Sequence, residues 1–174
     1  MAVIEAIATT YLEADAATVT FSSIPATYQH LELRMSTRDT YASAYDSVFA
    51  RFNSLDGSLY TDHRLYAYTL AVEAGGAFEQ TYARLGRSIG TPSSDDSTFA
   101  TSVCTIMDYA NTNKNTTFIN TCGSAEATYP FSALDSGFLN DDAAIHTITL
   151  YGVSSGSGTF QRGSMFSLYG LNSS

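Results

Sequence analysis

The sequence has 174 residues and a net charge of −9, with 8 lysine and arginine residues against 17 aspartate and glutamate residues. It contains one lysine, Lys114, and no basic cluster, which argues against a nucleic acid or an anionic membrane surface as partner. Hydrophobic residues make up 44% and charged residues 14%, so residues 1–174 can form one domain whose surface is covered mainly by serine, threonine, asparagine and tyrosine. Such a surface is common in β-rich proteins, and also in proteins whose outside is covered by neighbours.

Alternation of apolar and polar residues predicts strands in the first third of the chain. The predicted strands cover residues 4–10, 18–22, 31–35 and 47–53. For the first of them, Glu5 and the alanines leave a short helix open as an alternative. Pro25 cannot donate to a strand ladder and predicts a corner between the second and third strands. The polar stretch 36–46 predicts a loop.

The middle of the chain is harder to interpret. Residues 60–73 fit both alternation and helical spacing, and their aromatic and β-branched content favours an extended chain. We expect Gly75-Gly76 to break this segment and residues 78–89 to form the next strand. Residues 99–109 and 116–122 predict a hairpin, because the polar run between them has the composition of a turn.

The last third of the chain also predicts strands. Tyr129-Pro130-Phe131 predicts a corner within residues 128–136. The remaining segments are a loop over 137–142, a strand over 144–151, a serine-glycine linker over 152–158 and a final strand region over 159–171. Together these signals predict an all-β fold, an antiparallel and jelly-roll-like β-sandwich of about 8–10 strands.

The two cysteines, Cys104 and Cys122, fit no zinc motif and are too few for a disulfide scaffold. If the hairpin turn is centred on Asn113, the two cysteines lie opposite each other, where a bridge is conceivable. The alternative is a pair of reduced, buried thiols, which a reducing compartment favours.

Candidate catalytic and metal-binding residues are scattered. The histidines are His30, His63 and His146, and no nucleophile motif accompanies them. Asp95-Asp96 and Asp141-Asp142 lie in predicted loops without the spacing of an EF-hand. We therefore expect no enzyme activity, no metal and no cofactor, and keep a glycan hydrolase or esterase as the alternative.

Twelve tyrosines and no tryptophan point to tyrosine as the aromatic residue of interfaces. Tyr41 and Tyr45 fall in the predicted loop 36–46 and are the candidate interface residues. Tyr66, Tyr151 and Tyr169 fall in predicted strands, where we expect them to fill the core with their hydroxyl groups near the rim.

Three stretches together resemble a known group of proteins: residues 18–35, the run Asp62-His-Arg-Leu-Tyr, and residues 158–171. In order and spacing they resemble small virion structural proteins of tailed bacteriophages. The resemblance implies a β-sandwich that decorates the particle, and it carries over no functional residues.

The implied function is capsid decoration, in which the protein cements the head by binding between major capsid protein subunits. We expect a homo-oligomer, with a trimer as the first guess. The implied alternative is a tail, baseplate or fibre component that contributes to assembly or to host-glycan recognition. The start of the sequence lacks the basic and long apolar regions of a signal peptide. We therefore expect synthesis in the host cytoplasm and location in the virion.

Overall fold

The computed structural model describes residues 4–89, 97–125, 129–152 and 158–172. These residues form strands and connections without a helix, as the sequence predicted. The twelve strands are β1 (Ile4–Tyr11), β2 (Thr18–Phe21), β3 (His30–Thr37), β4 (Tyr45–Phe52), β5 (Tyr60–Tyr68), β6 (Ala71–Gln80), β7 (Ala83–Ile89), β8 (Ala100–Met107), β9 (Thr117–Ser124), β10 (Phe131–Leu139), β11 (Ile148–Gly152) and β12 (Met165–Leu171).

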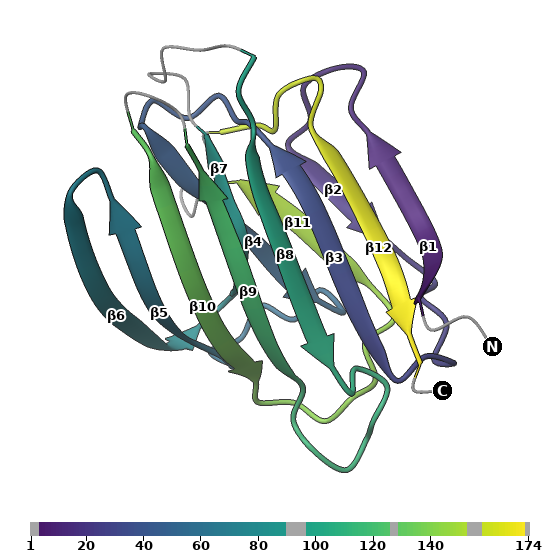
Figure 1. Cartoon of the computed structure of the whole chain (residues 1–174). Helices are drawn as coiled ribbons and strands as arrows, with labels where there is room; N and C mark the ends of the chain where they lie inside the picture. Colours follow the sequence, from purple (N-terminus) through teal and green to yellow (C-terminus); the bar gives the residue numbers. More distant parts are fainter. Residues whose placement is uncertain (1–3, 90–96, 126–128, 153–157, 173–174) are drawn as a thin grey trace.

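The strands form two antiparallel sheets that pack face to face (Figure 1). The large sheet has the order β1-β12-β3-β8-β9-β10-β5-β6, and the small sheet has the order β2-β11-β4-β7. The chain passes repeatedly from one sheet to the other, which confirms the predicted jelly-roll-like sandwich with more strands than expected. Because the large sheet is wider, the β5–β6 hairpin lies at one side of the sandwich.

The core lies between the sheets and follows the alternation seen in the sequence. Leu31, Leu33 and Met35 of β3 are buried, whereas Glu32 and Arg34 between them face outward. From the small sheet, Val48, Ala50 and Phe52 of β4 face the same interior. Side chains at period two therefore place the apolar set of each central strand on one face.

The predicted break at Gly75-Gly76 is wrong. The chain turns earlier, at Thr69 and Leu70, where Thr69 has a φ of 50°. Both glycines lie inside β6, and a Cβ on Gly76 would come within 3.0 Å of the His63 ring. The glycines thus permit close packing of β6 on β5. The predicted strand over residues 78–89 is also wrong, because its first residues belong to β6 of the large sheet and the others to β7 of the small sheet.

The hairpin of β8 and β9 forms, but its predicted register is wrong. Met107 pairs with Thr117, and Cys104 pairs with Asn120 in place of Cys122. Asp108 has a φ of 51° and follows the last residue of β8, so this strand ends two residues earlier than predicted and the connection is longer. Both cysteines are free and buried.

Strand β10 continues to Leu139, through residues that were predicted to form a loop. Gly137 pairs with Phe118 of β9 on one side and with Asp62 of β5 on the other. The Phe118 ring lies over Gly137 on the inner face, which explains why a strand passes through a glycine that resembles a turn signal. The predicted loop that contains Asp95-Asp96 and the predicted linker over residues 152–158 fall largely outside the described residues.

We expect Gly137→Ala to lower the free energy of unfolding by about 1–3 kcal/mol. The added methyl group would meet the backbone oxygen of Thr61 and lie 2.5 Å from the Phe118 ring, so a strand or the ring must move. Urea unfolding of the variant measures the loss. Gly57→Ala is the control, because its added Cβ would make only ordinary contacts with Leu59, at 3.5 Å or more. Equal stability of both variants would contradict the prediction.

Candidate functional site

The most distinctive surface of the molecule is the outward side of β9, β10, β5 and β6 in the large sheet. Its exposed apolar side chains are Leu65, at 51% exposure, Val72, at 72%, Phe78, at 75%, Ile119, at 47%, and Leu134, at 44%. We call these five residues the apolar face. Soluble proteins rarely expose a contiguous apolar surface of this kind without a binding role.

Strand register explains how the apolar face becomes continuous. Leu134 of β10 pairs with Leu65 of β5, which pairs with Ala74 of β6. One step along the sheet, Ala67 pairs with Val72. Since paired residues of neighbouring strands lie side by side, residues distant in the sequence form one surface.

Charged groups are nearly absent from this side of the four strands. The outward positions between the apolar side chains are occupied mainly by serine, threonine, alanine and glycine. His63 is the one ionisable side chain among the outward positions that β5, β9 and β10 contribute. A partner could therefore cover this surface without removing fixed charges from water.

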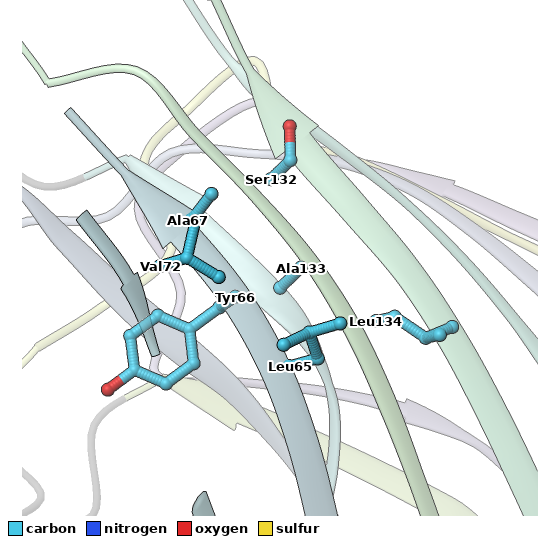
Figure 2. A pocket seen from close by; sticks show the side chains of 7 residues that line it. All are labelled: Leu65, Tyr66, Ala67, Val72, Ser132, Ala133 and Leu134. Carbon is cyan, nitrogen blue, oxygen red and sulfur yellow. The ribbon is translucent and has the colours of Figure 1, made fainter. Parts of the chain in front are cut away.

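Two open hollows mark the apolar face. The first, of 330 Å³, lies between Leu65, Val72 and Leu134, with the small residues Ala67 and Ser132 also lining it. In Figure 2, Leu65 and Leu134 lie close together and the Tyr66 ring points away from Leu134. A second hollow, of 510 Å³, is lined by residues of β5, β9 and β10, among them His63 and Phe138, and by Phe78 of β6. Both hollows are wide and shallow, which suits the side chains of a partner protein more than an enclosed small molecule.

The other end of the same sheet carries charge. Arg34 of β3 pairs with Glu32 at 2.8 Å, and its guanidinium lies 4.8 Å from the centre of the Tyr169 ring of β12. The large sheet thus has a charged end over β3 and β12 and an apolar end over β10, β5 and β6. This division supplies matched control positions for experiments on the apolar face.

Behind the apolar face, the inner side of the same strands holds a charged network. Asp62 of β5 accepts a hydrogen bond from Arg84 Nε of β7 at 3.0 Å, and Arg84 also bonds Ser47 of β4. Asn120 donates to Asp135 at 3.1 Å, and burial raises the pKa of the Asp135 carboxyl, whereas the Arg87 charge opposes that rise. The contact between Asp62 and Arg84 joins the two sheets, whereas Asn120 and Asp135 lie on neighbouring strands of the large sheet.

The tyrosines lie in a different arrangement from the one predicted. Tyr45 belongs to β4 and is half-buried, with its ring centre 5.6 Å from that of Phe131 and 6.2 Å from that of Tyr68. Arg87 lies between Tyr45 and Tyr66, at 5.4 and 4.8 Å from the ring centres. Tyr45 thus helps to hold the sheets together, and its role at an interface stays a prediction.

Tyr41 lies in the connection before β4 and is also half-buried. Its backbone N–H donates to Asp39 at 2.9 Å. The structure therefore does not bring Tyr41 into the apolar face, and neither candidate tyrosine belongs to it. The residues that do were missed because alternation alone does not tell which side of a strand faces the core. One feature of the sequence could have indicated the apolar face: residues 65–78 contain only one charged residue, Glu73.

A second buried charged group lies at the end of β3. Arg38 and Asp39 have no exposed surface, and Arg38 donates to the Thr98 carbonyl at 3.1 Å. Burial raises the pKa of the Asp39 carboxyl to about 6, although the Ser88 hydroxyl and the Tyr41 N–H both donate to it. Asp46 raises this pKa further and Arg38 lowers it. Both buried groups therefore influence the stability of the protein.

The scattered candidate residues do not converge. His30 accepts a hydrogen bond from the Asp108 N–H, and His146 contacts the Thr147 hydroxyl beside it. Asp141 accepts from the Ala143 N–H within its own turn, and Asp95-Asp96 lies outside the described residues. In the part of the chain that the structure describes, no group of three histidine, cysteine or acidic residues could hold a metal ion. The described residues also contain no helix that could cross a membrane.

Both thiols are poor nucleophiles. Burial raises the pKa of Cys104, and it raises that of Cys122 to about 11. Since the thiolate is the reactive form, neither cysteine suits catalysis or metal binding. They fill space in the core, which was one of the two alternatives left open by the sequence.

Comparisons with known proteins add little beyond the fold. No known protein family matches the sequence, and no curated protein matches it. Among solved structures, the chain is similar in outline to the galectin LEC-6 of Caenorhabditis elegans, with 9% sequence identity and a TM-score of 0.36, over 95% of this chain and 96% of the galectin. A likeness this distant carries no argument about function.

Proposed function

We propose that this protein is a non-enzymatic structural component of a bacteriophage virion, a capsid decoration protein that binds between subunits of the head as a homo-oligomer. The observation that supports a binding role most directly is the apolar face. The resemblance of three sequence stretches to small phage virion proteins supplies the class of partner.

The apolar face is suited to contact with another protein. Exposed Leu65, Val72 and Phe78 would each gain about 1.5–3 kcal/mol from full burial against a partner. The neighbouring serine and threonine hydroxyl groups can hydrogen-bond at the rim, as in other protein interfaces. A decoration protein of this kind stabilises a shell because it binds two neighbouring subunits at once.

The location of the protein on intact particles tests this proposal. Virions are purified and labelled with a specific antibody coupled to gold, or imaged by cryo-EM, and their protein content is measured by mass spectrometry. Signal spread over the head is the expected result. Signal confined to the tail would replace the proposal with the tail, baseplate or fibre role, and absence of the protein from virions would overturn both.

We expect the double variant Leu65→Lys, Leu134→Lys to bind heads that lack the protein roughly a hundredfold more weakly than the natural sequence. The two leucines are paired neighbours on the apolar face, and each lysine would place a charge where apolar burial is needed. Ala6→Lys is the control, because Ala6 is exposed on β1, next to Tyr169 at the charged end of the sheet. Co-sedimentation of protein with heads measures binding. Loss of binding in the control, or none in the double variant, would contradict the prediction.

A further inference from the structure

Strand β6 ends the large sheet and leaves one side of its backbone without a strand partner among the described residues. Natural edge strands are protected from pairing with other chains by lysine, proline, bulges or short length. β6 has ten residues without lysine or proline, and its one irregularity lies at its end, where Glu79 has a φ of 54°. The edge is therefore open to another strand along most of its length.

The acidic side chains of β6 do not prevent another strand from pairing along this edge. Glu73 faces the inner side of the sheet, where the hydroxyl groups of Tyr66 and Tyr68 donate to its carboxylate at 2.6 and 2.7 Å. These hydrogen bonds lower the pKa of Glu73 and hold its side chain over β5. On the outward side, β6 presents Val72 and Phe78, both strongly exposed.

We propose that β6 pairs antiparallel with β6 of a second copy, about a two-fold axis that passes between the two Gly75 residues. The pairing is isologous, so each contact occurs twice. It deepens the proposed function, because it joins two apolar faces into one continuous surface, and it favours a two-fold assembly over the trimer.

The sequence of β6 selects this register. Side chains of directly opposite residues must lie on the same side of the sheet. One residue of β6 must therefore lie opposite its own copy, with the axis between the two. Only Gly75 and Gly76 lie near the middle of the strand. An axis at Gly76 would place Glu73 opposite Glu79 of the other copy, and such like-charge pairs are unfavourable. An axis at Gly75 places Val72 opposite Phe78 and leaves no acidic pair.

Sedimentation velocity tests the pairing in solution. We expect the protein to form a species of two chains, and Ala74→Lys to raise its dissociation constant by roughly tenfold or more, since lysine on an edge strand opposes pairing. Thr121→Lys is the matched control, because Thr121 is exposed on the same side of the sheet, but on the interior strand β9. Circular dichroism of each variant establishes that it is folded.

Cysteine cross-linking tests the register. In the proposed pair, Val72 lies opposite Phe78 at a Cβ separation of about 4.5–5.5 Å, whereas the two copies of Val72 lie about 20 Å apart. We expect a mixture of Val72→Cys and Phe78→Cys proteins to form disulfide-linked dimers under mild oxidation, and neither variant alone to do so. The natural thiols are buried and do not compete.

Several outcomes would overturn the inference: a protein that stays monomeric at all concentrations, three chains in the assembly, equal weakening by Thr121→Lys, or self-linking of Val72→Cys. These outcomes are separate from the proposed function. A monomer found on the phage head would refute the pairing and the homo-oligomer but not the virion role, whereas a β6-paired dimer missing from virions would refute only the virion role.

Discussion

Replacement of Arg38 by methionine is expected to lower the free energy of unfolding by about 1.5–3 kcal/mol at neutral pH, because a buried, charge-assisted hydrogen bond is lost. Arg38 has no exposed surface and donates to the Thr98 carbonyl. Its loss would leave the carboxyl group of Asp39 buried without its cationic neighbour and would remove a hydrogen bond. The Arg38 charge favours the ionised form of the Asp39 carboxyl, so its removal adds to the cost of keeping that charge buried.

Urea unfolding of Arg38→Met at pH 7 and at pH 4 measures this effect. The loss should be smaller at pH 4, because the Asp39 carboxyl is then protonated in the folded protein and needs no cation. The double variant Arg38→Met, Asp39→Asn should regain more stability at pH 7 than Asp39→Asn adds to the natural protein, because without Arg38 the Asp39 charge is less well compensated. A single variant as stable as the natural protein, or a gain in the double variant no larger than that of Asp39→Asn alone, would show that the two groups are not coupled.

Replacement of Asp39 by asparagine is expected to stabilise the protein at pH 7 by up to about 3 kcal/mol, the equivalent of a rise in pKa from 3.8 to about 6. A carboxyl whose pKa is higher in the folded state binds its proton more tightly there than in the unfolded chain. Its contribution to stability is therefore complete below about pH 4 and is lost as the pH rises through about 6. Asparagine resembles the protonated form and can keep partners at both Ser88 and Tyr41.

The free energy of unfolding of both proteins between pH 4 and pH 8 checks this prediction. The difference should be near zero at pH 4, grow to about pH 6 and stay constant above it. Asp56→Asn is the control, since Asp56 is an exposed residue of a turn and should not change the curve. A difference that stays flat across this range would mean that Asp39 titrates as it does in the unfolded chain.

Strand alternation predicted the central part of the fold because those strands have one buried and one solvated side. In β3, apolar and polar residues alternate without exception from Leu31 to Ser36, and the structure follows them. Alternation says less where both sides of a strand are apolar or small. In the β5–β6 hairpin, Leu65 and Val72 face outward while Tyr66 and Tyr68 face inward, so the sequence showed no dominant side.

Glycine caused most of the errors, for a physical reason. Gly76 and Gly137 both resemble turn signals, but each lies within a strand where a neighbouring side chain, His63 or Phe118, occupies the space of the missing Cβ. Turn composition reports local backbone freedom, whereas these glycines are required by contacts with residues distant in sequence. The apolar face was missed for a related reason, since its continuity depends on register between four strands.

The first and last strands of the described chain are neighbours, and Ile4 pairs with Leu171. The described chain therefore begins and ends at one corner of the sandwich, on the edge of the large sheet opposite β6 (Figure 1). A fluorescent protein or a peptide tag fused at either end would project away from the β5–β6 side of the molecule. A short linker could also join the two ends, with new ends opened at the exposed Leu70 tip, as circular permutation requires. The fold can thus carry cargo without obstructing the surface that we propose it uses to bind.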